Sequence, residues 1–476
     1  MIKMPSKTRP EKSSRNMIAI AAVLILMLAV SSCATHAPVP GRVPAQAPLA
    51  ANGSGSDVSH WWQSLADPLL VQLIASAQAA SPALAQARSR IVEARAERVS
   101  RGAVLLPTLD FAASSARTSQ QSVLPLGTIS QAALQSTWEV DLFGANRANR
   151  DAAQARLEGA QALWHQARVA LAAEVALDYY ELRACQGLLA VAQQDATSRQ
   201  NTARLTGLGA KAGFQAPATV ALANASAAEG RSRLTAQGVQ CALDMKALMA
   251  VSARPEAEIV EQLTHQSEQQ VESDTAPIGH AVALDALPAA TLSQRPDVFN
   301  AERAVAAASL EVGSSEAQRY PRLSLSGSVG FANFRSDGMS LSLDTWSIGP
   351  LAVSLPIFDG GRRRANLATA RAHYEEAVIT YRASVRQAVR EVEQALLNVE
   401  ASRLRSGDAR IAREGYRISF LAFEKRYENG MASLLELEDA RRTRLNSDSN
   451  VINLEHDRNA AWVALYRAAG GGWQPE

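Results

Sequence analysis

"PIFDGGRRRANLATA", residues 356–370, joins two sequence patterns of different kinds. It starts in a stretch of alternating apolar residues, typical of a β-strand, and it ends in an alanine-rich stretch typical of an α-helix. Gly360 and Gly361 lie between them, and because they lack a Cβ they permit backbone turns that other residues resist. Three arginines follow. Arginines at a helix N-terminus are typical of phosphate or nucleic-acid sites, so a structural joint and an anion site are both open interpretations.

The charge balance argues against a nucleic-acid site. The chain of 476 residues has a formal net charge of +2, but residues 1–33 hold five basic groups and one acidic group. The remainder therefore carries 43 basic and 45 acidic groups. Proteins that bind nucleic acids generally show a basic excess, so we expect no nucleic-acid partner.

The N-terminal residues predict a lipoprotein signal peptide over residues 1–32. Basic residues precede an apolar run at residues 17–30, and small residues then lead to Cys33. The run is shorter than the ~20 residues of a membrane-spanning helix. We expect cleavage before Cys33 and attachment of acyl chains, such as palmitate, to this cysteine; an uncleaved anchor is the alternative. Residues 33–58 are rich in Pro, Gly, Ala and Ser and predict a lipidated tether.

The strand-to-helix joint occurs twice in the chain. "DLFGANR", residues 141–147 with Gly144, corresponds to "PIFDGGR", residues 356–362, and the residues around the two joints align at an offset of 215. A second pair of segments aligns at an offset of 217. Such self-similarity indicates one structural unit used twice. We predict a first repeat at residues 59–250, a polar and irregular equatorial linker at 251–292, and a second repeat at 293–476.

Each repeat contains two segments with the period-2 alternation of β-strands. The expected strands are residues 107–117, 131–143, 321–334 and 346–358. Alternation over about ten residues suits a transmembrane barrel with lipid outside and water inside, but such barrels need at least about eight strands. We therefore expect three chains to contribute four strands each to a twelve-stranded barrel.

Long proline-free helices follow the strands in both repeats. Residues 147–206 would form a helix of about 90 Å at ~1.5 Å per residue, and the shorter flanking helices, added together, nearly match that length. The expected helices are residues 82–105, 147–206 and 214–250 in the first repeat and 296–318, 362–427 and 432–468 in the second. Short helices stacked beside long ones predict an α-helical barrel.

No arrangement of residues predicts catalysis. The seven histidines never occur at metal-ligand spacing. Residues 207–213 resemble a dinucleotide-binding loop only superficially, because they follow a helix and not a strand. We expect no enzyme activity, no cofactor and no metal site.

Several long motifs in a fixed order make the sequence resemble the TolC-type outer membrane factors, specifically their NodT-like lipoprotein branch. The motifs are "HWWQSLADPLL" (60–70), "LLPTLDF" (105–111), "WEVDLFGANR" (138–147), "LSQRPDV" (292–298), "RYPRLSLSG" (319–327), "LPIFDGGRRRAN" (355–366) and "KRYENGMASLLELEDAR" (425–441).

The resemblance implies an α+β membrane protein: a homotrimer whose twelve-stranded barrel continues into a long periplasmic α-helical barrel. It implies a passive exit duct in the cell outer membrane for drugs, solvents or metabolites. The implied partners are outer-membrane lipid, a periplasmic membrane-fusion adaptor and an inner-membrane efflux pump of the RND type. A type I protein-secretion duct is the alternative within the same scaffold. A purely structural lipoprotein is disfavoured because a spacer needs no strands.

The resemblance also assigns roles to the glycines. Gly144, Gly360 and Gly361 become the joints between outer-membrane strands and periplasmic helices, which places the arginines near lipid headgroups. Gly213 and Gly430 become the tips of helical hairpins, where an adaptor would dock.

A periplasmic gate is expected at the second tip. Leu435, Asp439 and Arg442 share one helix face at spacing i, i+4, i+7, and the matching first-repeat positions carry no charge. By resemblance, Leu435 would form an apolar ring, and Asp439 with Arg426 a charged ring that closes the aperture. Glu428 departs from the family pattern, which leaves the ion-pair partners open. Solvated helix charges are the alternative.

Two cysteines remain in the mature chain. Cys185 and Cys241 each lie 28 residues from Gly213, so in an antiparallel hairpin they lie at the same height, about 42 Å from the tip. The periplasm is oxidising, and we therefore expect a disulfide between them; two buried free thiols are the alternative.

Overall fold

The computed structural model describes residues 67–120, 124–270, 295–336 and 338–473. The signal peptide, Cys33, the tether and most of the linker lie outside these residues. The described chain forms two compact units, one of residues 90–160 and 301–381, the other of the remaining residues.

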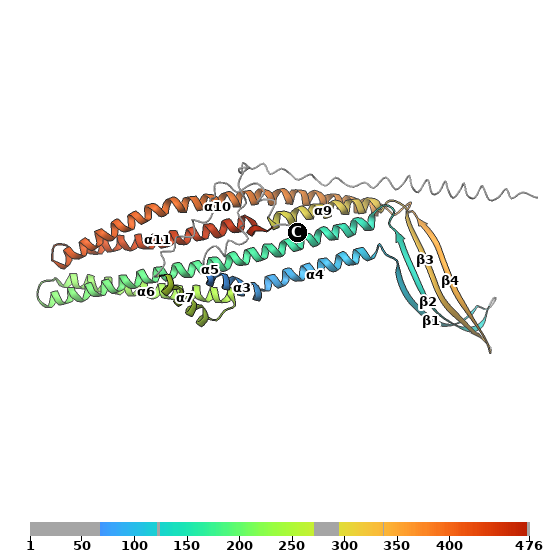
Figure 1. Ribbon diagram of the computed structural model, residues 1–476, viewed down its shortest axis with the longest axis horizontal. Helices are drawn as coiled ribbons and strands as arrows, with labels where there is room; N and C mark the ends of the chain where they lie inside the picture. Colours follow the sequence, from blue (N-terminus) through green and yellow to red (C-terminus); the bar gives the residue numbers. More distant parts are fainter. Residues whose placement is uncertain (1–66, 121–123, 271–294, 337, 474–476) are drawn as a thin grey trace, which may run out of the picture. The chain divides into compact units, whose positions relative to one another are not determined.

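The first unit contains a four-stranded antiparallel sheet in the order β1-β2-β3-β4 (Figure 1). Its strands are β1 (Thr108–Gln120), β2 (Leu124–Val140), β3 (Arg322–Ser336) and β4 (Met339–Ser354). The expected boundaries of β2 and β4 were wrong, since both strands begin seven residues earlier and end three or four residues earlier. The hairpin turns are therefore shorter than the sequence pattern suggested, and the segments after Val140 and Ser354 are turns that lead into helices.

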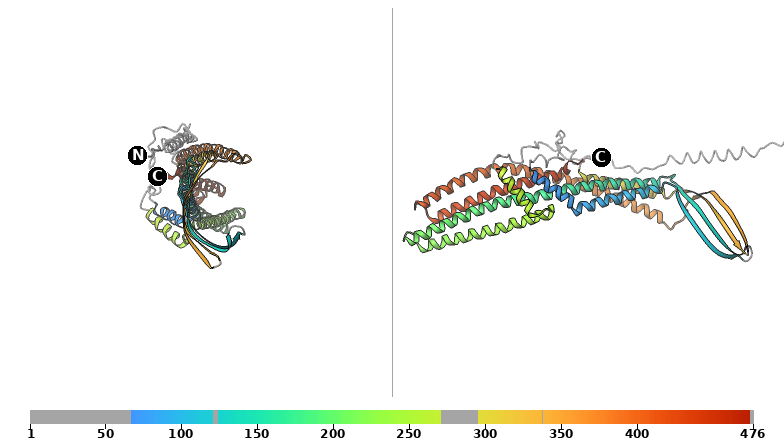
Figure 2. Two further views of the ribbon diagram at one scale, coloured as in Figure 1. Left: turned by 90° about the vertical axis from the view of Figure 1, so that its right-hand side faces the viewer. Right: turned by 60° about the horizontal axis from the view of Figure 1, so that its bottom comes forward.

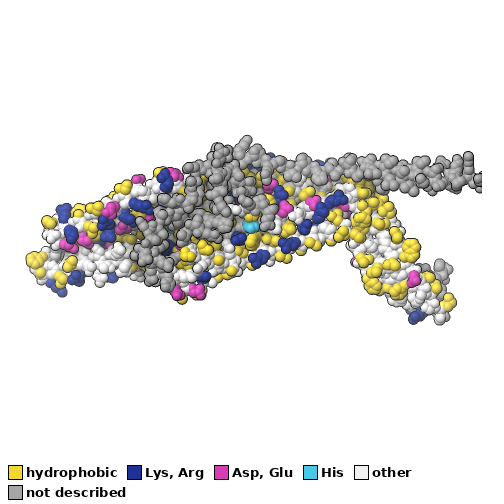
Figure 3. All heavy atoms as spheres, in the orientation of Figure 1, with side chains coloured by type: hydrophobic (Ala, Val, Ile, Leu, Met, Phe, Trp, Pro, Cys, Tyr) yellow, Lys and Arg dark blue, Asp and Glu magenta, His cyan; other side chains and the backbone are white. Residues whose placement is uncertain are grey.

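The register divides the side chains of the sheet between two faces. Phe111, Leu134, Val329 and Trp346 lie opposite one another across all four strands and define what we call the apolar face. On the reverse, called here the polar face, Ser328 and Ser347 are 2.9 Å apart through their hydroxyl oxygens. Hydrophobic side chains cover much of the strand region in view in Figure 3. The sheet is thus amphipathic, as the alternation predicts.

Both strand-to-helix joints are built alike. Asp141 accepts hydrogen bonds from the backbone N–H groups of Asn146 and Arg147 at 3.1 and 2.8 Å. Asp359 does the same for Gly361 and Arg363 at 3.0 and 3.2 Å. These carboxylates satisfy N–H groups at the starts of the long helices α5 (Ala145–Lys211) and α10 (Arg362–Glu428).

The glycines of these joints adopt the left-handed conformation. The φ angles are +77° at Gly144, +64° at Gly360 and +90° at Gly361. A side chain with a Cβ is strained at such angles, so the sequence uses glycine where the chain turns from strand to helix.

Helices α5 and α10 both have 67 residues and contribute to both units. The other helices are α3 (Pro68–Ala80), α4 (Pro82–Ala103), α6 (Pro217–Ser252), α7 (Glu256–Gln270), α9 (Pro296–Ala317), α11 (Leu434–Ala468) and a 3₁₀ turn at Gly470–Gly472. In the second unit, α6 lies beside α5 and α11 beside α10 (Figures 1 and 2). Among the described residues, no single helix has the length and apolar character needed to cross a membrane; α3 and α4 together pass that test as a pair bent by 52°.

Helix α7 corrects the expectation of an irregular linker. It begins with Glu256 and Glu258 in its first turn, where the helix dipole favours negative charge. Ile259 and Leu263, four residues apart, are buried on one face. The first part of the linker is therefore an amphipathic helix, which its polar composition concealed.

A disulfide joins Cys185 of α5 to Cys241 of α6, with Cα atoms 5.5 Å apart. The two cysteines are 56 positions apart in the sequence, and for a loop of this length chain entropy predicts a stabilisation of about 4 kcal/mol. We expect unfolded, unreduced mature protein to expose no free thiol at these positions and to gain two on reduction, as counted by thiol titration. Two free thiols before reduction would contradict the pairing.

Candidate functional site

The two helical hairpins of the second unit share an apolar cluster near their turns. Ala223 of α6, Phe420 of α10, and Leu434 and Leu437 of α11 are buried against one another. Tyr427 of α10 lies nearby, its hydroxyl 2.8 Å from that of Thr206 on α5. The hairpins of the two repeats are therefore packed together and not merely adjacent.

The start of α11 determines which of its side chains face this cluster. Ser433 and Glu436 form a capping box, with backbone N–H to side-chain distances of 2.7 and 3.2 Å. Hydrogen bonds from the backbone and hydroxyl of Ser433 lower the pKa of Glu436. With the first turn held in this way, Leu434, Leu437 and Arg441 are buried.

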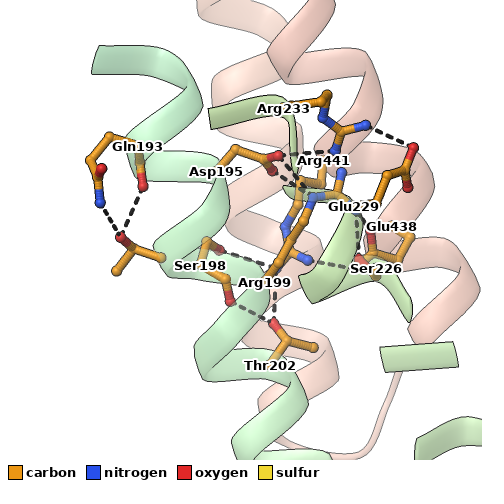
Figure 4. Close-up of polar contacts among 11 residues, drawn as sticks. Gln193, Asp195, Ser198, Arg199, Thr202, Ser226, Glu229, Arg233, Glu438 and Arg441 are labelled. Carbon is orange, nitrogen blue, oxygen red and sulfur yellow. Dashed lines mark hydrogen bonds and ion pairs between the residues drawn. The ribbon is translucent and has the colours of Figure 1, made fainter. Parts of the chain in front are cut away.

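Arg199 of α5 is the centre of a buried polar network (Figure 4). Its Nε donates to both carboxylate oxygens of Asp195 at 2.9 Å. Its Nη1 donates to Ser226 of α6 at 2.6 Å and to Glu438 of α11 at 2.5 Å. One guanidinium thus connects three helices from the two repeats.

Arg441 of α11 makes a second set of connections in the same network. It donates to Glu438 at 2.5 Å, to Ser198 at 3.1 Å and to Thr202 at 2.9 Å, the last two on α5. Its guanidinium carbon lies 5.8 Å from the centre of the Phe420 ring. The polar network and the apolar cluster are therefore in contact through Arg441 and Phe420.

The charges of this network balance but are costly to bury. The side chains of Asp195, Arg199 and Arg441 are 3%, 6% and 3% exposed, so each charge depends on its partners for the solvation that water would supply. Burial lowers the pKa of Arg441, opposed by Glu438. Arg233 of α6, which is half-exposed, donates to Asp195 at 3.2 Å and extends the network to the surface. Such a network fixes one arrangement of the helices and loses much of its energy if a single member is removed.

Gly230 of α6 provides the space that Arg199 occupies. A Cβ at this position would lie 2.9 Å from Cδ of Arg199 and 3.3 Å from Cα of Ala196. The close approach of α6 to α5 therefore requires a glycine here.

Comparisons with known proteins agree with this architecture. The family model described as "Outer membrane efflux protein" matches residues 73–252 and 287–471. The chain belongs to this outer membrane efflux protein family. It is 30% identical over 430 residues to nodulation protein T of Rhizobium leguminosarum bv. viciae, covering 88% of this chain and 87% of that protein.

Two further matches cover most of the efflux protein. The toluene efflux pump outer membrane protein TtgI of Pseudomonas putida is 30% identical over 435 residues, 86% of each chain. The solved structure of the outer-membrane channel OprN superimposes with a TM-score of 0.78 at 27% identity, covering 93% of this chain and all of that one. The protein is accordingly the outer-membrane channel component of a tripartite efflux system.

The residues expected at the periplasmic gate of the efflux protein lie on the exposed side of α11, whereas Arg441 is buried. Leu435 is 71% exposed, and Asp439 pairs with Arg442, both exposed. Within the described chain, Arg426 contacts the Met431 carbonyl oxygen at 3.3 Å and the Phe423 ring, and it is not paired with Asp439. Within one chain Arg426 folds back over the turn that precedes α11, and the charged ring expected from Asp439 and Arg426 stays a prediction.

Sequence reasoning missed the buried network. Arg441 lies four residues after Leu437 and seven after Leu434, so it occupies the apolar stripe of α11. A charged residue in such a stripe is a signal that it has a buried partner, and this signal could have identified Arg441. Its partners on α5 lie more than 230 residues away and no spacing indicates them.

The hairpin glycines of the efflux protein occupy the expected turns. Gly213 between α5 and α6 has a φ of +80°, and Gly430 between α10 and α11 has a φ of +72°. Both adopt the left-handed conformation that ends a helix. Adaptor docking at these tips stays a prediction. Among the described residues, no group of three or more His, Cys, Asp or Glu side chains is placed to bind a metal.

Proposed function

We propose that three copies of this chain close a twelve-stranded barrel in the outer membrane and continue it as a helical duct through the periplasm. The observation that carries the proposal is the amphipathic sheet, whose edge strands β1 and β4 have no further partner strand among the described residues. Backbone groups in lipid must be paired, and four strands are too few to close a barrel. The apolar face then meets lipid and the polar face lines the water-filled lumen.

The duct accepts small molecules from an inner-membrane pump of the RND type through a periplasmic adaptor. The name of the relative TtgI, a toluene efflux pump outer membrane protein, supports small apolar compounds as one class of cargo. The protein acts as a conduit and not as an enzyme, since its matches are named as outer-membrane efflux proteins and channels. The lipid anchor at Cys33 holds each protomer to the membrane.

The assembly is testable by mass. Native mass spectrometry of mature protein in detergent should give three copies, each beginning at an acylated Cys33. A stable monomer that conducts ions would contradict the shared barrel, and an intact residue 1–32 segment would contradict lipidation.

Substitutions on the exposed face of α11 test whether these residues narrow the periplasmic end of the duct. We propose that Leu435, Asp439 and Arg442 approach the neighbouring protomers, with Arg426 beside them, and that these contacts narrow the periplasmic end. Asp439→Ala or Leu435→Ala should raise the single-channel conductance in planar bilayers and admit larger antibiotics such as vancomycin. Unchanged conductance in both variants would contradict the gate: Asp439 would then be a solvated helix charge, and Leu435 would not narrow the aperture.

A further inference from the structure

The two faces of the sheet exchange character toward the hairpin ends. Beyond Phe331, the face that carries the apolar residues becomes polar. Ser115 and Ser130 lie opposite each other there, with hydroxyl oxygens 2.9 Å apart. Asn333 donates to the facing Ser342 at 2.8 Å.

At the same level, the reverse face becomes apolar. One row crosses all four strands through consecutive register partners, and its members are Ala116, Ile129, Phe334 and Leu341. We call these four residues the apolar row. Leu343 lies beside it on the same face, and Leu341 and Leu343 are each 54% exposed.

The position of Phe334 is specified by a glycine on the neighbouring strand. A Cβ on Gly127 would lie 2.7 Å from the Phe334 ring, so the ring occupies space over Gly127 that any other residue would fill. An aromatic ring that covers a cross-strand glycine holds its orientation by packing. The apolar row is therefore built into the sheet and does not result from freely rotating side chains.

The length of the apolar face shows where this row lies. From Leu323 to Phe331 the apolar residues extend about 26 Å along β3 at ~3.3 Å per residue, which strand tilt reduces to about 20 Å, most of the ~25 Å height of the lipid-facing band. The residues after Phe331 then project beyond the lipid on the side of the hairpin turns. In the proposed orientation, with the helices in the periplasm, that side is the cell exterior.

We propose that the apolar row of three copies forms a hydrophobic constriction of the lumen at the outer end of the duct. This inference rests on the proposed barrel. Outside the membrane both faces of the sheet meet water, and the outer face is polar there as expected. Apolar side chains on the lumen face lose more of their exposed area to water if they approach their counterparts on the other two copies. Hydrophobic constrictions of this kind resist passage by excluding water.

The test measures access from outside the cell. Ser347→Cys places a thiol on the lumen face, on the membrane side of the row, and Ser342→Cys places one on the outer surface beyond the lipid. Intact cells are treated with a membrane-impermeant maleimide that is too large to pass through general porins. The native cysteines contribute no background, since Cys185 and Cys241 are joined and Cys33 is acylated under the proposal.

Ser342→Cys should react rapidly, and Ser347→Cys at least about tenfold more slowly if the row excludes water. Leu341→Asn, added to Ser347→Cys, should restore rapid labelling. Leu341→Met, of similar size but apolar, should not. Ile129→Thr provides a second polar variant if Leu341→Asn fails to assemble.

Each outcome has a distinct meaning. Equally rapid labelling at both cysteines, or no acceleration by the polar variants, overturns the constriction and leaves the barrel intact. Acceleration by Leu341→Met as large as by Leu341→Asn shows that size and not hydrophobicity forms the barrier, which also overturns it. Slow labelling of Ser342→Cys places that residue away from the exterior and overturns the barrel orientation itself.

Discussion

Arg199→Ala is expected to separate the two helical hairpins near their turns and to raise the resting conductance of the channel several times. The Arg199 side chain is 6% exposed and contacts Asp195, Ser226 and Glu438. Removing one partner of a buried ion pair typically costs about 3–5 kcal/mol, because the remaining charge is left without solvation. Arg233 reaches Asp195 at 3.2 Å and should recover part of this loss. Hydrogen exchange of the α11 amides measures the separation, and bilayer recordings measure the conductance.

Arg417→Ala is the matched control for this experiment. Arg417 pairs with Glu414 on the surface of α10, with both side chains about half exposed, and exposed pairs contribute at most about 1 kcal/mol. Arg199→Lys keeps the charge but loses the planar fork of donors, so its effect should be intermediate. If the Arg199→Ala protein shows the same amide hydrogen exchange in α11 and the same conductance as the Arg417→Ala protein, the network does not hold the hairpins together.

Gly230→Ala is expected to destabilise the α5–α6 hairpin, although alanine favours helix. The new Cβ would lie 2.9 Å from Arg199 and 3.3 Å from the backbone of Ala196, so either the buried guanidinium or the helix must move. Overpacking of this kind costs roughly 1–3 kcal/mol. The midpoint of thermal unfolding should fall, and amide exchange around residues 195–202 should accelerate.

Gly238→Ala tests the same change on the same helix without the crowding. The nearest atom to a Cβ at Gly238 is a methyl group of Leu189 at 4.0 Å. Helix propensity alone should then stabilise α6 by up to about 1 kcal/mol, and the midpoint should rise or stay unchanged. If both substitutions raised the midpoint of thermal unfolding, or both lowered it, the hairpin would not require the space that Gly230 leaves beside Arg199.

Local sequence determines which segments are strands, which are helices and where one becomes the other. The alternation around Trp138 and Leu325 has the period of a strand, and the proline-free runs after Gly144 and Gly361 have the composition of helices. Equal distances of Cys185 and Cys241 from Gly213 place them at the same height in one hairpin. These inferences succeed because each depends on residues close in the chain and on fixed periodicities. Boundaries fail in α7, whose polar composition conceals a helix, and at the starts of β2 and β4.

Only the tertiary structure decides which partner each face meets. The spacing of α11 places Leu435, Asp439 and Arg442 on one side, but it does not say that this side is exposed and that Arg441 is buried. The apolar row likewise appears only when the register aligns Ile129 with Phe334 and Leu341. The physical reason is distance along the chain: Arg199 and Glu438 are 239 residues apart, and no local periodicity encodes a contact between them. A buried charge is stable only with its partner, so the long-range packing determines where the network forms.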